Sequence, residues 1–182
     1  YLEFRLRRYL TFAEFKSELA PHFGLGLEGY ATWTSPIRKY SDMVNHRLIK
    51  AVLTQQACNK PQDEVLARLQ EARRQNRLVE RDIADWLYCR YLADKVALNA
   101  EFEAEVQDVM RGGLRVQLLE NGASMFIPAS TLHNNKEEMQ VNSDEIALYI
   151  KGERIYKIGD IVRVKLTEVK EATRSIVGEI VQ

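Results

Sequence analysis

Two cations and two aliphatic hydroxyl groups lie close together in the segment Thr34–Tyr40, which has the sequence TSPIRKY. Ser35 is a good helix N-cap because its hydroxyl can accept a hydrogen bond from a first-turn N–H, and Pro36 suits the first helical position. The segment therefore predicts a helix that begins at Pro36. Its free N–H groups, together with Arg38 and Lys39, would gather positive charge, which favours an anion such as phosphate. The alternative is an ordinary capped helix whose Arg38 and Lys39 point into water.

The wider segment around TSPIRKY resembles the signature of the ribonuclease II family of exoribonucleases, which is the signature of the RNB domain. Members of that family carry a T-S-P-I-R-[RK]-Y segment that is followed by an Asp and by an H-R pair. The matching residues here are Thr34–Tyr40, Asp42 and His46-Arg47, together with His22–Leu25 and Tyr30 upstream.

The resemblance implies a role for several of these side chains. Enzymes of this family hydrolyse RNA from its 3′ end, so we expect degradation of single-stranded RNA to 5′-mononucleotides. The resemblance implies that Arg38 is the catalytic residue of this segment and binds phosphate oxygens near the scissile bond, because a guanidinium suits bidentate phosphate contact. Thr34, Ser35 and Lys39 are candidates for the same anion. Glu80, which lies among arginines, is expected to face the RNA end and to discourage tight product retention.

The family holds magnesium with a cluster of closely spaced aspartates in a segment well before this signature. The aspartates of this chain are scattered, whereas a hard divalent cation needs several oxygen ligands that converge on one point. We therefore expect Mg²⁺ in the complete enzyme and no metal bound by this chain. The chain begins at Tyr1 in what reads as mid-domain sequence. This predicts that residues 1–98 are the C-terminal part of an RNB domain, that its N-terminal part is missing, and that the fragment cannot cleave RNA alone.

The elements that must position these residues are mainly helical. In chain order the sequence predicts a helix at Thr11–Leu19, one or two strands in His22–Thr34, a helix from Pro36 to about Leu53, and one long helix from Pro61 to about Val96. Polar residues spaced three or four apart form a stripe on one face of the helix predicted from Pro36. They are Arg38, Asp42, Asn45 and His46.

Near Ala100 the pattern changes to alternation of apolar and polar residues, which is typical of strands. The predicted strands are Phe102–Val109, Leu114–Leu119, Ala123–Pro128, Ile146–Lys151, Ile161–Val169 and Ser175–Val181. Asn121-Gly122 and Lys151-Gly152 are predicted hairpin turns. Short strands with turn signals favour a small closed barrel, so we place a domain boundary at about Ala100.

Residues 101–182 resemble the ribosomal-protein-S1-type RNA-binding domain, a member of the OB-fold family. That family shows an [FI]-[IV]-P-x-S segment and a later G-D-x-V-x-V strand, which here are Phe126–Ser130 and Gly159–Val164. The insertion Asn134–Tyr156 is less regular than the family pattern. The expected fold class is therefore α+β, with a helix-rich C-terminal part of an RNB catalytic domain followed by an all-β OB-fold barrel.

OB-fold barrels hold single strands by stacking bases on aromatic side chains within a basic groove. The candidates for this role are Arg111, Arg115, Phe126, His133, Lys165 and Lys170, with Phe102 and Tyr156 as further aromatic candidates. Arg115 must face outward because it alternates with Leu114 and Val116. Phe126 could equally well belong to the barrel core.

The composition is that of a globular protein, with 46% apolar and 29% charged residues and a net charge of zero. Residues 1–100 contain 16 basic and 12 acidic side chains, and residues 101–182 contain 10 and 14. Affinity for RNA must therefore come from local patches and from base stacking. No apolar run has the length of a membrane span, and two distant cysteines favour free thiols. We expect a cytoplasmic monomer that acts in mRNA degradation and does not bind membranes.

Two other interpretations stay open at this point. The barrel could be a stand-alone module that binds single-stranded RNA, in which case Arg38 would not matter for affinity. Alternatively, the long helix could bind a protein partner through an unpaired apolar stripe, which would be visible as self-association.

Overall fold

The computed structural model describes Leu6 and residues 9–181. The chain divides into two compact units. We call Thr11–Val79 the N-terminal unit, and we call Glu80–Gln182, which is grouped with Tyr1–Leu10, the barrel unit. Each unit is described by itself.

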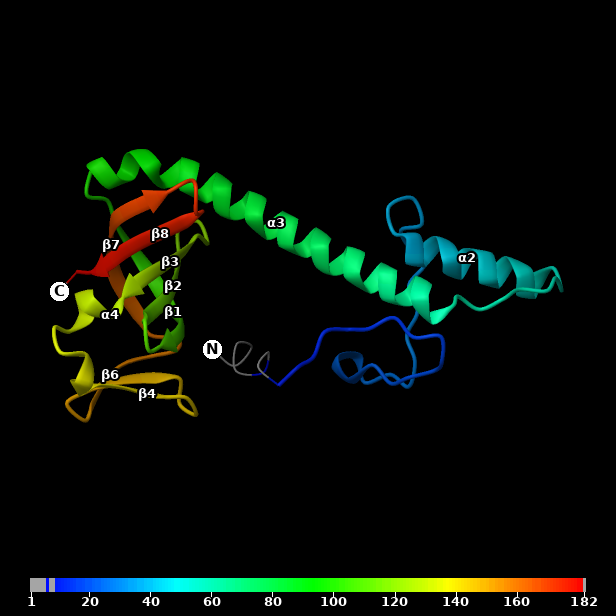
Figure 1. Ribbon diagram of the computed structural model, residues 1–182, viewed down its shortest axis with the longest axis horizontal. Helices are drawn as coiled ribbons and strands as arrows, with labels where there is room; N and C mark the ends of the chain where they lie inside the picture. The colour runs from blue at the N-terminus through cyan, green and yellow to red at the C-terminus, as the bar shows by residue number, and fades with distance from the viewer. Residues whose placement is uncertain (1–5, 7–8, 182) are drawn as a thin grey trace. The chain divides into compact units, whose positions relative to one another are not determined.

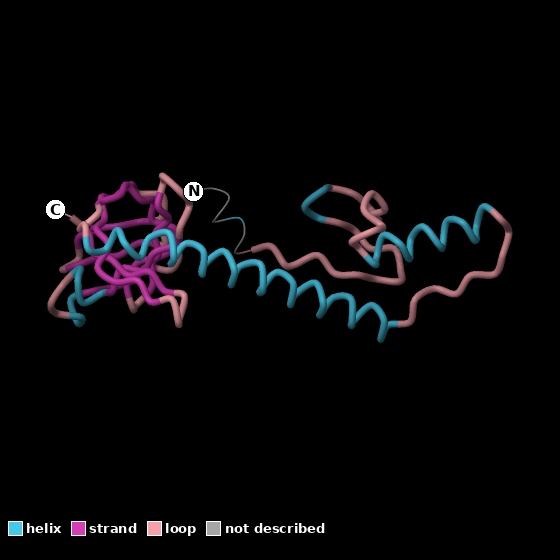
Figure 2. The backbone as a smooth tube through the Cα atoms, turned by 90° about the horizontal axis from the view of Figure 1, so that it is seen from above, coloured by secondary structure: helices cyan, strands magenta, loops and turns pink. Residues whose placement is uncertain are grey.

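The N-terminal unit contains a short 3₁₀ helix, η1 (Phe23–Leu25), the helix α2 (Tyr40–Leu53) and the first half of the helix α3 (Asp63–Ala97). The long helix predicted from Pro61 is confirmed by α3. The strands predicted in His22–Thr34 are wrong, because the structure has only an isolated bridge between His22 and Leu27 there. Figure 2 shows the backbone between residue 9 and α2 mostly as loop.

The predicted helix at Thr11–Leu19 is also wrong, because this segment has no helical structure and contacts the beginning of α3. The guanidinium of Arg77 lies 5.4 Å from the ring centre of Phe12, and that of Arg73 lies 5.6 Å from the ring centre of Phe15. Further along, Lys60 Nζ lies 3.0 Å from Glu18 Oε1. Phe12 and Phe15, which suggested an amphipathic helix, thus make cation–π contacts with arginines of α3.

The barrel unit contains a closed five-stranded barrel in the order β1-β2-β3-β8-β7 (Figure 1). Its strands are β1 (Glu101–Met110), β2 (Gly113–Leu118), β3 (Ser124–Pro128), β7 (Ile161–Lys170) and β8 (Ser175–Ile180). All neighbouring pairs are antiparallel except β3 and β8, which run parallel. A short helix, α4 (Ala129–Leu132), follows β3. This arrangement confirms the α+β fold class and the predicted barrel.

Alternation along the strands fills the barrel with apolar side chains. In β2, Leu114, Val116 and Leu118 are fully buried while the residues between them are exposed. Removing such alternating aliphatic side chains from water is the main stabilising contribution to a barrel of this size.

The second half of α3 packs against the barrel. Cys89 and Leu92 are fully buried in the same apolar cluster as the strands. At the edge of this contact the hydroxyl of Tyr88 donates to the carbonyl oxygen of Asn121 at 3.0 Å, and Arg174 Nη1 lies 3.0 Å from Asp82 Oδ2.

The insertion that the sequence marked as irregular forms a separate three-stranded antiparallel sheet. It consists of β4 (Met139–Asn142), β5 (Ala147–Ile150) and β6 (Glu153–Lys157), and it follows a second 3₁₀ helix, η2 (Lys136–Glu138). The hairpin predicted at Lys151-Gly152 is confirmed, because it joins β5 to β6. The strand predicted at Ile146–Lys151 exists, but it lies in this small sheet rather than in the barrel.

Candidate functional site

The TSPIRKY segment forms a loop that is held by the first turn of α2. The carboxylate of Asp42 accepts three hydrogen bonds, from the Thr32 hydroxyl at 2.5 Å, the Ser35 backbone N–H at 2.9 Å and the Ser41 hydroxyl at 3.2 Å. Asp42 is fully buried. A buried carboxylate is tolerated when its oxygens are satisfied in this way.

These contacts lower the pKa of Asp42. The hydrogen bond from Thr32 is the largest cause, burial opposes it, and the Ser35 N–H and the charge of Lys39 act in the same direction as Thr32. Asp42 is therefore a carboxylate at neutral pH and has its full capacity to accept these bonds.

Two further side chains of α2 hold the same loop. Asn45 Nδ2 donates to the carbonyl oxygen of Thr32 at 2.7 Å, and His46 Nε2 lies 2.7 Å from that of Trp33. A carbonyl oxygen can only accept, so His46 donates from Nε2. Of the polar stripe predicted on this helix, Asp42, Asn45 and His46 lie on α2 and hold the loop, whereas Arg38 lies in the turn before the helix.

The helix predicted from Pro36 begins four residues later, at Tyr40. Its N-cap is Lys39, which makes no side-chain capping bond, so the predicted N-cap role of Ser35 is wrong. Pro36–Arg38 form a turn in which the N–H groups of Arg38 and Lys39 point to the Ser35 carbonyl oxygen, at 3.3 and 2.9 Å. The positive end of the helix is therefore displaced from the segment where we expected it.

The cations that we proposed for an anion are exposed on this loop. Thr34, Arg38 and Lys39 are exposed, and Ser35 is half-buried. Among the described residues, Arg38 and Lys39 take part in no ion pair with a carboxylate. Asp42 contacts neither guanidinium nor ammonium directly, so these two positive groups stay available to an anion.

The sequence suggested that Asp42 either orients Arg38 across one helical turn or simply pairs with it within the helix, and it did not predict the hydrogen bonds from Thr32 and the Ser35 N–H. A signal was present, because an acidic residue at the third position of a helix often reaches back to a free N–H upstream. Here Asp42 occupies that position, but it reaches Ser35, four residues before the N-cap.

The barrel brings together three of the other predicted residues on its outer surface. Arg115 of β2 and Phe126 of β3 are opposite each other in the strand register, and both side chains face outward. A Cβ placed on Gly112 would lie 3.7 Å from Cζ of Phe126, so the ring reaches back over the turn that carries exposed Arg111. Phe126 is therefore not a core residue. We call Arg111, Arg115 and Phe126 the barrel face.

The remaining barrel candidates lie elsewhere or are already engaged. Lys165 and Lys170 are on β7, where their ammonium groups lie 3.8 Å from Glu179 and 2.8 Å from Glu168. Phe102 is only 6% exposed, so its proposed role as a stacking platform is wrong. Tyr156 is partly buried, and burial raises the pKa of its hydroxyl.

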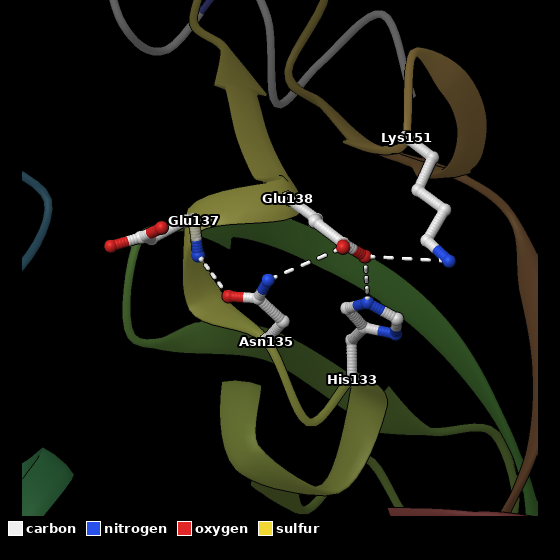
Figure 3. Close-up of polar contacts among 5 residues, drawn as sticks. All are labelled: His133, Asn135, Glu137, Glu138 and Lys151. Carbon is white, nitrogen blue, oxygen red and sulfur yellow. Dashed lines mark hydrogen bonds and ion pairs between the residues drawn. The ribbon is translucent and has the colours of Figure 1, made fainter.

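His133 is part of a polar cluster between the barrel and the small sheet (Figure 3). Its Nε2 lies 2.6 Å from Glu138 Oε2, and the same carboxylate group accepts from Asn135 Nδ2 at 3.2 Å and lies 3.6 Å from Lys151 Nζ. The cluster connects the end of α4 to η2 and to the β5–β6 turn. His133 is thus used within the protein, although it stays a predicted RNA contact that the structure does not test.

Replacement of Glu138 by Gln is expected to lower stability in a pH-dependent way. The hydrogen bond from His133, with smaller contributions from Lys151 and Asn135, holds the pKa of Glu138 below its ordinary value of 4.5. A lowered pKa stabilises the folded state above the unfolded value, and that contribution is lost as the pH falls through the folded value. The variant should therefore unfold at lower urea concentration than the unchanged chain at neutral pH, and the difference should vanish once the pH has fallen through the folded-state pKa of Glu138.

Glu137→Gln is the matched control, because Glu137 lies in the same short helix and its carboxylate points away from the cluster. A pH-independent effect of Glu138→Gln would contradict the assignment.

The structure shows where Glu80 lies but does not test its predicted role. Glu80 is exposed on α3. In the described part of the chain, no group of three or more His, Cys, Asp or Glu side chains could hold a metal ion. No helix among the described residues is long and apolar enough to cross a membrane.

Two segments of the chain match known protein domains. Residues 1–55 match the RNB domain, and residues 95–180 match the S1 RNA binding domain. Over its full length the chain is 91% identical to Exoribonuclease 2 of Haemophilus influenzae (strain 86-028NP), and over 98% of its length it is 77% identical to Exoribonuclease 2 of Pasteurella multocida (strain Pm70). The chain spans only 28% and 27% of the length of these relatives.

Solved structures show the same fold. The apo form of RNase R from Mycoplasma genitalium superimposes with a TM-score of 0.78 over 97% of this chain and 28% of that chain, at 21% identity. The same protein in complex with ribose methylated single-stranded RNA gives the same TM-score. Both resemblances seen in the sequence are confirmed. The chain is therefore similar to Exoribonuclease 2 over a part of that protein's length, with RNB domain sequence in residues 1–55 and S1 RNA binding domain sequence in residues 95–180.

Proposed function

We propose that the complete protein to which this segment corresponds is a hydrolytic exoribonuclease, which degrades single-stranded RNA from its 3′ end to 5′-mononucleotides. The observation that carries the proposal is the 91% identity, over the whole chain, to a protein named Exoribonuclease 2. The proposal includes a monomer that acts in mRNA degradation in the cytoplasm.

Within that protein the loop on α2 binds the phosphate backbone of RNA. Arg38 provides a planar fork of N–H donors, and Lys39 adds a second positive charge beside it. Both side chains are exposed and unpaired with carboxylates in the described residues. Arg38 is the catalytic residue of this segment in our proposal, because a fixed cation at the scissile phosphate stabilises the negative charge that develops there.

The barrel face provides the second contact with RNA. The exposed side of the Phe126 ring offers a stacking surface for a base, and Arg111 and Arg115 provide charge for the adjoining phosphates. Lys165 and Lys170 are weaker contributors, because a bound phosphate would compete with Glu179 and Glu168 for them.

Magnesium is the metal that we propose for the complete protein. The described residues of this chain do not fit such a site, because they bring no three carboxylate or imidazole groups together. The ligands would therefore belong to the part of the protein outside this chain. We expect this chain alone to bind labelled single-stranded RNA without shortening it, with magnesium present.

Replacement of Phe126 by Ala is expected to weaken binding of single-stranded RNA by this chain roughly 5- to 100-fold, the loss of one stacked base. Arg115→Ala should reduce the slope of affinity against salt concentration by about one phosphate contact. Titration of fluorescently labelled RNA at several salt concentrations measures both effects. Arg154→Ala, at an exposed strand position of the small sheet, is the matched control for Arg115. Unchanged affinity of the Phe126 variant would exclude the barrel face as the binding surface.

A further inference from the structure

Four hydrogen bonds join the loop to side chains of α2 among the described residues. Ile37 is completely exposed, and Trp33 and Tyr40 are 47% and 50% exposed. The loop therefore gains little from burial of its apolar side chains. Its position depends on the hydrogen bonds made by Asp42, Asn45 and His46.

Asp42 makes the bond that lies nearest to Arg38 along the chain. Its Oδ2 accepts from the backbone N–H of Ser35, and the carbonyl oxygen of Ser35 accepts in turn from the N–H groups of Arg38 and Lys39. The peptide groups on either side of Ser35 are thus fixed by the carboxylate on one side and by the turn on the other. Asn45 and His46 hold Thr32 and Trp33, which lie further from the cations.

A carboxylate is needed for this set of contacts. All three groups that face Asp42 donate hydrogen bonds: two hydroxyls and one backbone N–H. An asparagine side chain at this position has the same shape but only one oxygen, which the hydroxyls would use. Its NH₂ group would then face the Ser35 N–H, and no hydrogen bond can form between these two donors. The turn that carries Arg38 would then lose its attachment to α2.

We propose that Asp42 is a positioning residue, which acts on RNA through Arg38 without contacting RNA itself. This inference rests on the proposed function, in which Arg38 binds phosphate near the scissile bond. Misplacement of a catalytic group by about 1 Å can cost on the order of 100-fold in rate. The buried carboxylate therefore controls the rate from beneath the loop.

A double-mutant cycle in a full-length protein that carries this segment tests the inference. Asp42→Asn is expected to lower the turnover of single-stranded RNA on the order of 10- to 100-fold, with the protein still folded by circular dichroism. In a protein that already carries Arg38→Ala, the same change should have little further effect, because residues that act as one unit are not additive.

An equal loss from Asp42→Asn in both backgrounds would overturn the inference, and so would full turnover of the single variant. Thr32→Val, which removes one donor and leaves the Ser35 bond in place, should cause a smaller loss. If Asp42→Asn does not fold, the cycle is run with Thr32→Val, and additivity with Arg38→Ala again overturns the inference. Wild-type turnover of Arg38→Ala alone would instead overturn the catalytic role of Arg38 in the proposed function.

Discussion

Arg38→Ala is expected to lower the turnover of single-stranded RNA by the full-length protein about 10²–10³-fold, the usual cost of removing one charge-stabilising donor from an active site. The side chain is exposed, lies on a loop fixed at Ser35, and has no carboxylate partner among the described residues. Loss of this side chain should therefore leave the fold unchanged and affect only the binding and turnover of RNA. Single-turnover degradation of end-labelled RNA measures the effect on the chemical step.

Two further variants sharpen this test. Arg38→Lys keeps the charge but loses the planar fork, so it should restore part of the activity and not all of it. Arg68→Ala, an exposed arginine on α3, is the matched control and should behave like the unchanged protein. Equal activity of Arg38→Ala and Arg68→Ala would mean that the loop does not hold the reacting phosphate.

Gly113→Ala is expected to lower the free energy of unfolding of the barrel by about 3 kcal/mol or more, which combines backbone strain with overpacking. Gly113 begins β2 with φ of +143°, and a Cβ there would lie 1.9 Å from the Ile127 carbonyl oxygen and 2.9 Å from the Ala129 nitrogen. Both atoms are backbone, so no side-chain rotation can relieve the contact. Urea unfolding followed by circular dichroism measures the loss.

Gly152→Ala is the control for backbone conformation alone. Gly152 has φ of +84°, but no atom lies within 4 Å of the added Cβ. Its substitution should cost about 1 kcal/mol, the strain of a positive φ without a clash. Equal losses at the two positions would show that β2 and β3 separate easily at Gly113.

The barrel could be predicted from the sequence because its signals are local. Alternation in β2 and β3 and the turn at Asn121-Gly122 each specify structure within a few residues. What could not be predicted was the partner of each strand. The segment that forms β5 looks like the others, but it pairs with β4 and β6 because the insertion supplies its own neighbours.

The loop before α2 could not be predicted because distant contacts decide it. Ser35-Pro36 satisfies the local rules for a helix start, but the Ser35 N–H is taken by Asp42, and the turn that follows delays the helix to Tyr40. The helix prediction at Thr11–Leu19 was wrong for a related reason. Phe12 and Phe15 stack on arginines of α3, and these contacts compete with helix formation.

The sequence predicted which residues belong to the candidate site better than it predicted how they are arranged. Arg38 and Lys39 were named as an anion site from the segment TSPIRKY and are exposed, and the outward direction of Arg115 was predicted from alternation. Phe102 shows the limit, because a sequence cannot tell an aromatic side chain that contacts ligand from one that packs inside the protein. Asp42 shows the converse, because its place in the sequence indicated one upstream N–H partner but not the two hydroxyl donors beside it.

The reactivity of the two cysteines can be used to measure how often the second half of α3 detaches from the barrel. Cys58 is exposed, whereas Cys89 is fully buried where α3 meets the strands, and burial, followed by the charges of Asp85 and Glu171, raises the pKa of its thiol. Only a thiolate reacts quickly with alkylating reagents. One thiol per chain is therefore titrated at once, and the second is consumed only as fast as this part of the helix detaches.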